Sequence, residues 1–533
     1  MKQNSTLLQI CAVALGLAVF SGGEVNAQTP GTQNQPAPAE VLKVIDRLIE
    51  QNRKLEDQNR ELMQELANLR QVLAASPTPI IAVVPATPAA PADKADIAPA
   101  PADHASAASA DAPSFVAADK KAVAAGQQSG AFQKDPKYWG TYTPNFGFRL
   151  ANTKYGDANL SIYTYARYLN QLGLDPTFTD SFGTVKSVKQ RQDFQLQKVQ
   201  IKFLGWIMSE KFRYFLYAWT NNAVQGQGAQ VVLAGNLNYS FNKYFTLSAG
   251  ITSLPGTRSV EGNFPFWYGV DSRLIADEYF RPSYTGGIWA KGQITDKLRY
   301  QAMLGTNLSI LGVSAAQLNN GFDTFSGALV WTPTGGDFGM GFGDFENHEK
   351  FATRFAGHFT RSDEDRQSQP NTESIENTQL RISDGNTIFT PGLFGKNVNI
   401  TNARYKMTAF DAGFKYHGYS FDTSYYLRWL GSFQGNNTQQ LSGLFDQGFD
   451  AQFSAMLMPR TLQLYTGGSK ILGQYGKPWD YRTGLNFFPF KNRVVRWNFE
   501  GLYLGRSPVG YTAVPFAVGG KGFVFHSSLE LAF

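Results

Sequence analysis

The last twelve residues of the chain, "GFVFHSSLELAF" (522–533), decide how the rest of the sequence is interpreted. Apolar residues interrupted only by Ser527 fill one face of this segment: Phe523, Phe525, Leu529, Leu531 and Phe533. The other face is mostly polar and carries Val524, His526, Ser528, Glu530 and Ala532. A period of two belongs to a strand, because successive side chains of a strand point to opposite faces. The segment therefore predicts a two-faced strand that ends on Phe533.

The same alternation recurs through residues 136–533. It is seen in "VVLAGNLNYSF" (231–241), "LRYQAMLGT" (298–306), "FDTSYYLRW" (421–429), "FDAQFSAML" (449–457) and "VRWNFEGLY" (495–503). A soluble β-sandwich also alternates. Segments of about 9–11 residues instead favour strands that cross a membrane, with the apolar face toward lipid and the polar face toward the lumen. We expect an all-β, transmembrane antiparallel β-barrel of about 16 strands, since roughly 22–26 residues serve each strand with its connection.

The N-terminus predicts export. Lys2 precedes an apolar run from Leu7 to Phe20, and "VNA" (25–27) offers small residues for cleavage, so residues 1–27 are interpreted as a signal peptide. The alternative is an N-terminal membrane anchor, but the run is shorter than the roughly 20 residues of a spanning helix. The single cysteine, Cys11, lies in this segment, so the mature chain would hold no disulfide.

Residues 40–74 predict a coiled coil in the periplasm, although one amphipathic helix on a domain surface is the alternative. Two series with a spacing of seven residues form its core: Val41, Leu48, Leu55, Leu62 and Leu69, and Ile45, Asn52, Asn59, Leu66 and Leu73. Asparagines at consecutive core positions lower stability but fix register. Residues 75–135 are rich in Ala and Pro and predict a disordered, extended linker. Residues 136–533 would then be the barrel domain.

Composition excludes several classes of protein. Of 533 residues, 14% are aromatic and 17% charged, and the net charge of +6 comes without a basic run interleaved with aromatics, so no nucleic acid partner is expected. No nucleotide, zinc-protease or hydrolase motif occurs, so we expect no enzyme, no cofactor, no metal and no catalytic residue. His526 beside Ser527 and Ser528 suggests a hydrolase, but Ser527 lies on the opposite face and Ser528 has no evident orienting partner.

Two pairs of segments resemble the phosphate-selective porin O and P family. "GFDAQFSAMLMPRTLQLYTGGSKILGQ" (448–474) followed by "DYRTGLNFFPFKNRVVRWNFEGLYL" (480–504) is similar to the last strands of that family. "LSAGITSLPGTRSVE" (247–261) followed by "RPSYTGGIWAKGQITDKLRYQAMLGTN" (281–307) is similar to its central section. The coiled coil and linker resemble the extension of DcaP-like trimeric porins, which pass dicarboxylates. These resemblances imply a 16-stranded, trimeric channel that prefers anions.

A pore selects by the charges at its narrowest point. The long connection 253–284 is the candidate constriction, with Arg258, Arg273 and Arg281 placed to grip a passing carboxylate or phosphate. The alternative is an external loop that rests on a trimer neighbour. The alternation predicts nine lumen-facing basic residues: Arg167, Lys198, Lys202, Arg299, Arg354, Lys415, Arg428, Arg482 and Arg496. It also predicts five lumen-facing acidic residues: Asp411, Asp422, Asp450, Glu500 and Glu530. Many of these could instead pair across strands.

Two other segments stand out. The polar stretch 362–405 predicts an extracellular loop, and "FGMGFGDF" (338–345) predicts a crowded wall or turn. Taken together, the sequence predicts a bacterial outer-membrane porin for passive diffusion of small hydrophilic or anionic solutes. Its partners would be outer-membrane lipid and two further copies in a homotrimer. The alternative function is a structural tether between the outer membrane and peptidoglycan, with an incidental pore.

Overall fold

A computed structural model describes residues 142–143, 147–221, 230–261, 267–308, 321–334, 338–339, 341–366, 380–510 and 513–533. The predicted signal peptide (1–27), coiled coil (40–74) and linker (75–135) lie outside these residues. Within the described part of the chain, no helix combines the length and the apolar character that crossing a membrane requires.

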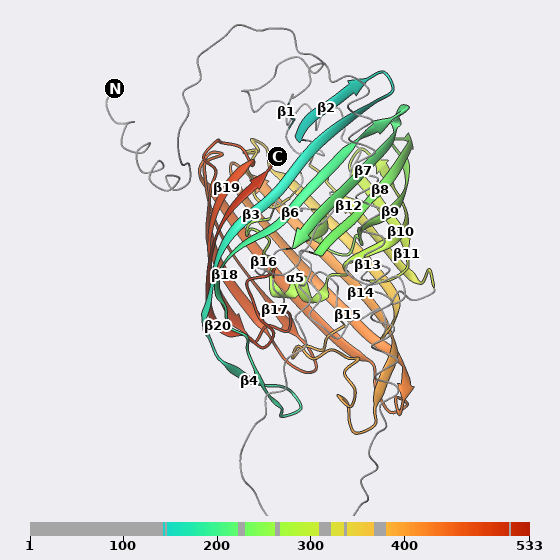
Figure 1. Ribbon diagram of the computed structural model, residues 1–533, viewed down its shortest axis with the longest axis vertical. Helices are drawn as coiled ribbons and strands as arrows, with labels where there is room; N and C mark the ends of the chain where they lie inside the picture. Colours follow the sequence, from blue (N-terminus) through green and yellow to red (C-terminus); the bar gives the residue numbers. More distant parts are fainter. Residues whose placement is uncertain are drawn as a thin grey trace, which may run out of the picture. The chain divides into compact units, whose positions relative to one another are not determined.

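Among the described residues, sixteen strands form one closed antiparallel barrel (Figure 1). Consecutive strands pair with each other, and the last strand pairs back onto the first, from Gly522↔Leu174 to Ala532↔Tyr163. The barrel strands are β3 (Gly156–Leu174), β6 (Gln192–Ile207), β7 (Ser209–Asn221), β8 (Gln230–Asn242), β9 (Phe245–Ser253), β10 (Tyr284–Thr295), β11 (Leu298–Gly305), β12 (Thr324–Trp331), β13 (Ala352–Asp365), β14 (Asn399–Tyr416), β15 (Tyr419–Asn436), β16 (Leu444–Met458), β17 (Leu462–Leu472), β18 (Trp479–Phe487), β19 (Val495–Gly505) and β20 (Lys521–Ala532).

Four short strands and two short helices accompany the barrel. β1 (Tyr142–Thr143) pairs with β2 (Gly147–Thr153), which pairs in turn with the beginning of β3. β4 (Thr177–Thr179) and β5 (Val185–Ser187) form a separate hairpin. The helices α4 (Arg258–Glu261) and α5 (Ile275–Phe280) both lie in the connection between β9 and β10.

The two faces of β20 lie as the alternation predicts. Phe523 and Leu529 are each 52% exposed on the outside, whereas His526 and Glu530 are fully buried on the inside. β19 follows the same rule, with Trp497 exposed outside and Arg496 buried inside. Phe533 follows β20, and its backbone N–H and carbonyl both bond to Ile162 of β3. The predicted all-β barrel and its strand number are confirmed.

Exposed aromatic residues line the outside of the barrel along its strands; on β15 they are Tyr419, Phe421, Tyr425 and Trp429. Along β15, Tyr419 and Trp429 are both exposed and lie ten positions apart. A rise of 3.3 Å per residue and a tilt of 35–45° place them roughly 25 Å apart along the barrel axis. Trp331 contacts Phe355, and Trp429 contacts Phe445, with ring centroids 5.7 and 5.3 Å apart respectively.

The two ends of the barrel differ. At one end, which we call the turn end, most connections are short, such as residues 417–418 between β14 and β15. The exception there is the connection 332–351 between β12 and β13. At the opposite end, the loop end, the connections are longer. The predicted loop 362–405 is shorter in the structure. β13 continues to Asp365 and β14 begins at Asn399, so only residues 366–398 connect these strands.

The loop-end half of the barrel interior contains an apolar core. Loop residues such as Leu254, Phe280, Ile382 and Phe516 are almost fully buried there and belong to one cluster with inward-facing wall residues such as Tyr405. The barrel is therefore partly filled from the loop end, and the polar inner wall described below has to be considered together with what covers it.

Candidate functional site

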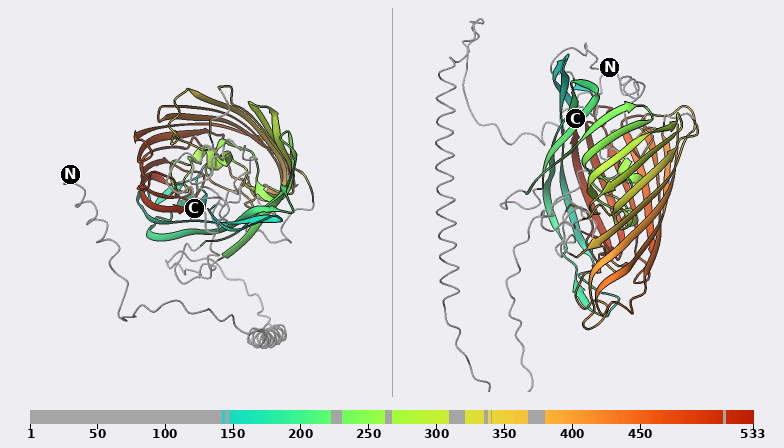
Figure 2. Two further views of the ribbon diagram at one scale, coloured as in Figure 1. Left: turned by 90° about the horizontal axis from the view of Figure 1, so that it is seen from above. Right: turned by 90° about the vertical axis from the view of Figure 1, so that its right-hand side faces the viewer.

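The connection between β9 and β10 folds into the barrel. Viewed along the barrel, α5 lies inside the ring of strands (Figure 2). Every residue of α5 is buried, and the helix contacts β15, β16, β17 and β18. The described residues of this connection therefore pack inside the barrel and not on its outer surface; that they form the constriction stays a prediction.

One anchor of this loop is an ion pair with β6. Lys198 Nζ lies 2.5 Å from Asp271 Oδ1, and Tyr165 donates a hydrogen bond of 2.6 Å to Asp271 Oδ2. Arg167 donates to the carbonyl oxygen of Val270 at 3.0 Å. A carboxylate that is removed from water needs such partners, because an unpaired buried charge is costly.

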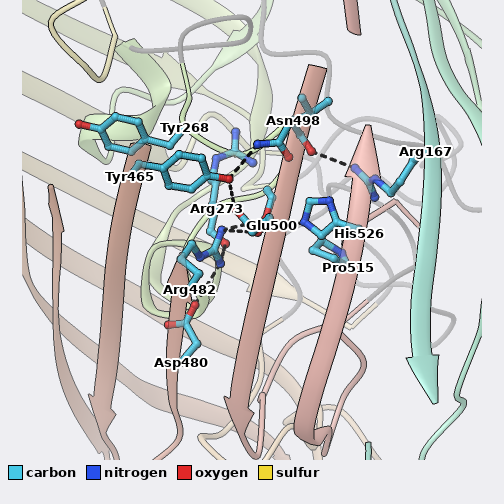
Figure 3. A network of polar contacts seen from close by, with 12 residues as sticks. Arg167, Tyr268, Arg273, Tyr465, Asp480, Arg482, Asn498, Glu500, Pro515 and His526 are labelled. Atoms are coloured by element: carbon cyan, nitrogen blue, oxygen red, sulfur yellow. Dashed lines mark hydrogen bonds and ion pairs between the residues drawn. The ribbon is translucent and has the colours of Figure 1, made fainter. Parts of the chain in front are cut away.

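A second anchor is the polar network on β18, β19 and β20 (Figure 3). Arg482 donates to Ser272 Oγ at 2.8 Å and to the carbonyl oxygen of Arg273 at 2.5 Å. Glu500 accepts from Ser272 Oγ at 3.0 Å and from the Tyr465 hydroxyl at 2.7 Å. Wall charges thus bond to loop backbone and side chains, which fixes the loop against this side of the barrel.

The three candidate constriction arginines are buried and paired. Arg258 Nε lies 3.3 Å from Asp422 Oδ1 of β15. Arg273 and Arg281 share Glu278, at 3.2 Å from Arg273 Nη1 and 3.1 Å from Arg281 Nε. The loop brings Arg273 and Arg281 together, while Arg258 lies against another part of the wall. Direct binding of a passing anion by these arginines stays a prediction.

A carboxylate in the same loop sits in an unfavourable environment. Asp277 of α5 is 6% exposed and lies close enough to Arg273, Glu278 and Arg281 for their charges to act on it. Burial raises the pKa of the Asp277 carboxyl, and Arg273 and Ser259 offset only part of that increase. The Asp277 carboxyl therefore takes up a proton more readily than a carboxyl in water.

Most of the nine predicted lumen-facing basic residues are buried on the inner side of the wall, and several form ion pairs. Beyond Lys198, the pairs join Arg354 to Asp411, Arg428 to Asp446, Arg482 to Asp480 and Glu500, and Arg496 to Glu530. These pairs neutralise the wall on β13–β20 and support its structure, which is the alternative that the sequence left open.

The other four of the nine predicted basic residues lie in surroundings different from those of these five. Arg167 donates to backbone carbonyls, as described, and Lys415 Nζ is buried 4.5 Å from the centre of the Phe338 ring. Lys202 Nζ lies 5.8 Å from the centre of the Tyr163 ring. Arg299 is opposite Val330, whose side chain is buried inside, so Arg299 also faces inward. Lys202 and Arg299 are only partly buried, unlike the wall arginines of β13–β20.

The structure adds two basic residues that the sequence prediction missed. Lys291 follows the inward-facing Trp289 by two positions, and Arg213 precedes the inward-facing Phe215 by two. Both are partly buried, and no carboxylate in the described part of the chain lies within ion-pair distance of either. The alternation could have found Lys291, because the opposite face of β10 carries Ile288 and Ala290. Arg213 was hidden because both faces of β7 are rich in apolar residues.

These residues define a basic lane on the turn-end half of β6–β11. Its charged side chains are Lys202, Arg213, Lys291 and Arg299, and Gln293 and Gln301 lie among them as partly buried, inward-facing amides. The strands β7 to β12 themselves contain one acidic residue, Glu210, which lies next to the turn that joins β6 to β7. The other acidic residues of this part of the sequence lie in the connections, such as Asp271, Asp277 and Glu278 between β9 and β10. The inner wall therefore has a basic side and, opposite, a side where charges cancel.

Of the residues that suggested a hydrolase, His526 lies near a carboxylate in the structure. His526 Nε2 lies 3.0 Å from Glu500 Oε1, which gives the histidine the orienting carboxylate that the sequence did not reveal. The Ser528 hydroxyl, however, has no hydrogen-bond partner, and all three residues are essentially fully buried. Nucleophilic catalysis needs a contact between the hydroxyl and its base, and access for a substrate. This cluster offers neither.

Comparison with known proteins gives structural similarity only. No family model matches the chain, and no curated protein matches it. Among solved structures, OmpT of Vibrio cholerae has a TM-score of 0.45 and 9% identity, covering 72% of this chain and 99% of its own. The anion-selective porin from Comamonas acidovorans has a TM-score of 0.43 and 7% identity, and the match covers 71% of this chain and 100% of that porin. The outer membrane channel DcaP of Acinetobacter baumannii has a TM-score of 0.45 and 7% identity, and the match covers 72% of this chain and 99% of that channel. These values are too low to assign a function.

Proposed function

We propose that this chain is an outer-membrane channel through which small hydrophilic solutes diffuse, with a preference for anions. Support for a membrane location comes from the closed barrel, since lipid offers no partner for open backbone groups. The exterior is apolar and carries exposed aromatic residues, and the span of roughly 25 Å from Tyr419 to Trp429 on β15 is about the height of the apolar band of an outer-membrane barrel. The predicted signal peptide is consistent with export.

The observation that carries the anion preference is the unequal distribution of charge inside the barrel. On β13–β20 the basic residues mostly face carboxylates, as in the pair of Arg496 with Glu530. On β7–β11 Arg213 and Lys291 have no carboxylate at ion-pair distance in the described part of the chain. A low-dielectric wall focuses the field of such charges into the interior, which concentrates anions.

The solutes that fit this wall are small anions with several oxygens, such as phosphate or a short dicarboxylate. Lys291 offers a point charge, and the nearby amides of Gln293 and Gln301 offer additional hydrogen bonds. We propose that the channel assembles as a homotrimer through the predicted coiled coil of residues 40–74, placed in the periplasm. The mechanism is size exclusion with electrostatic selection, without energy coupling.

Solute flux into liposomes tests this proposal. Purified, folded protein is reconstituted, and the entry of succinate, inorganic phosphate, a neutral sugar of similar size and a diamine of similar length is compared. We expect the two anions to enter faster than the sugar, and the sugar faster than the diamine. Entry of the diamine at the rate of succinate or faster would contradict the anion preference, and no entry of any solute would contradict the channel.

A further inference from the structure

The connection between β12 and β13 is unusual for the turn end. Of its described residues, Phe338 and residues 341–345 are buried in the barrel, whereas residues 346–351 are mostly exposed. Phe338 and Phe342 are 2% and 7% exposed, and Asp344 is fully buried. We call residues 338–351 the turn-end segment. It approaches the same interior that the β9–β10 loop enters from the loop end.

The backbone of the turn-end segment depends on alternating glycines. Gly339, Gly341 and Gly343 have φ of 72°, 85° and 79°, a left-handed conformation that other residues adopt at a cost. A Cβ on Gly343 would lie 2.4 Å from Gln463 Nε2 and 3.3 Å from a carbon of the Tyr268 ring. The sequence "FGMGFG" is thus suited to a tight path close to the wall and the loop.

The turn-end segment is joined directly to the β9–β10 loop. Arg258 Nη2 donates a hydrogen bond of 2.7 Å to the carbonyl oxygen of Gly341. The same guanidinium lies 4.7 Å from the centre of the Phe342 ring and 5.7 Å from that of Phe338. The Gly343 N–H donates to the Tyr268 hydroxyl at 3.1 Å, and Tyr268 also contacts Phe342 with centroids 5.6 Å apart.

The other side of the segment is fixed to the wall. Asp344 accepts a hydrogen bond of 2.7 Å from the Gly418 N–H in the turn between β14 and β15, and it is also paired with His348. Glu346 lies 3.6 Å from Arg493, which belongs to the connection between β18 and β19. Asp344 and Glu346 therefore have cationic or N–H partners. With Glu349 and Lys350 the segment carries a net charge of −2 when His348 is neutral, so its removal cannot reduce the positive charge of the interior.

We propose that the turn-end segment is a second constriction, which together with the β9–β10 loop sets the size limit and conductance of the channel. Arg258 is the positioning residue that holds the two elements together. This inference rests on the proposed channel function. Because the segment acts through its bulk, its removal should change conductance and the largest solute admitted, while the sign of ion selectivity, set by the basic lane, should stay the same.

The experiment replaces residues 335–350 of the full chain with a short Gly-Ser linker. The two ends can be joined, because Thr334 Oγ1 lies 3.1 Å from Thr353 Oγ1. A second variant, Phe342→Ala, leaves the backbone intact in case the first does not fold. The matched control is Phe490→Ala, which removes an exposed ring at the turn end. Folding is checked by heat-modifiable migration on a gel, and single-channel conductance, zero-current potential and liposome entry of sugars of increasing size are measured.

We expect the linker variant to raise conductance at least about twofold and to admit larger sugars, with an unchanged sign of the zero-current potential. Phe342→Ala should produce a smaller change in the same direction, and Phe490→Ala none. A conducting wild type whose conductance and size limit are the same in both folded variants would overturn this inference and leave the channel function standing. Conductance by neither the wild type nor a folded variant would overturn the channel function itself, whereas conductance by the variant alone would uphold the constriction.

Discussion

Lys198 and Asp271 both have a left-handed backbone, with φ of 51° and 50°, and their charged groups form an ion pair of 2.5 Å inside the barrel. Lys198 is an extra residue in β6, where the pairing with β3 shifts register between Tyr163 and Tyr165. Asp271 lies in the loop beside Ser272, which bonds to Glu500. Two local departures from regular geometry thus meet in one contact that fixes the loop to the wall.

Breaking this pair from one side should destabilise the loop. Asp271→Ala leaves Lys198 buried and without its carboxylate, a change that typically costs about 3–5 kcal/mol. The double variant Lys198→Met with Asp271→Leu removes both charges and should cost much less. Urea unfolding of the barrel in detergent measures the free energies of unfolding. Equal losses in the single and double variants would contradict the ion-pair account.

The basic lane should control ion selectivity. A single charge about 8 Å from a passing ion in water is worth about 0.5 kcal/mol, or about a twofold change in ion preference. Lys291→Gln should therefore lower the chloride-to-potassium permeability ratio about twofold, and Lys291→Glu should lower it further. The ratio is measured from zero-current potentials under a KCl gradient.

The matched control for the lane is Lys243→Gln. Lys243 lies in the turn between β8 and β9, where it is exposed and paired with Asp296 at 3.3 Å. The variant therefore removes one lysine charge at the turn end and leaves the inner wall unchanged. Its permeability ratio should equal that of the wild type. A ratio that changes equally in the Lys243 and Lys291 variants would show that overall charge, and not the lane, controls selectivity.

Gly343→Ala should loosen the turn-end segment. The left-handed conformation at this position disfavours any Cβ by about 1–2 kcal/mol, and the added methyl group would also displace Gln463. We expect faster cleavage of the segment by a protease added from the turn-end side, and larger fluctuations in single-channel current. Gly183→Ala is the control, because it also has a left-handed φ of 82° but no neighbouring atom near its Cβ. Identical protease sensitivity in wild type and Gly343→Ala would be evidence against this packing.

The fixation of the segment by Asp344 should fail only in acid. Burial alone would raise the pKa of the Asp344 carboxyl, but the hydrogen bond and charge of His348 and the Gly418 N–H lower it below its usual value. A carboxyl with a lowered pKa in the folded state stabilises the fold above the unfolded pKa, near 4, and this contribution is lost as the pH falls through the lower folded value. Conductance should therefore be constant from pH 8 to about pH 5 and rise only below about pH 4.

The Asp344→Ala variant separates this titration from that of other carboxylates. It should have the higher conductance at neutral pH and lack the acid rise. If the acid rise persists with the same midpoint in Asp344→Ala, another group is responsible and the role of Asp344 is wrong.

The orientation of the wall residues was predictable because it depends only on the alternation of side chains along each strand. Each strand faces lipid on one side and the interior on the other, so Leu529 and Glu530 can be assigned from their positions in the sequence alone. The same rule found the inward-facing arginines, and the length of residues 253–284 indicated a loop able to fold inside. The spacing of residues says nothing, however, about which charges will meet across the barrel.

The partners of the loop arginines could not be predicted for this reason. Asp422, which pairs with Arg258, lies in β15 and far away in the sequence, and only the closure of the barrel brings the two together. The path of "FGMGFGDF" was missed because glycines that permit a left-handed backbone also occur in ordinary turns. Its entry into the barrel depends on contacts with Arg258 and Tyr268, which come from another segment.

The measurement that tests the central claim most directly is the zero-current potential of the wild-type protein in a planar bilayer under a KCl gradient. The account predicts discrete conductance steps and a potential whose sign shows that chloride passes more readily than potassium. A folded, heat-modifiable barrel that gives no steps, or steps with a potential of the cation-selective sign, would contradict it.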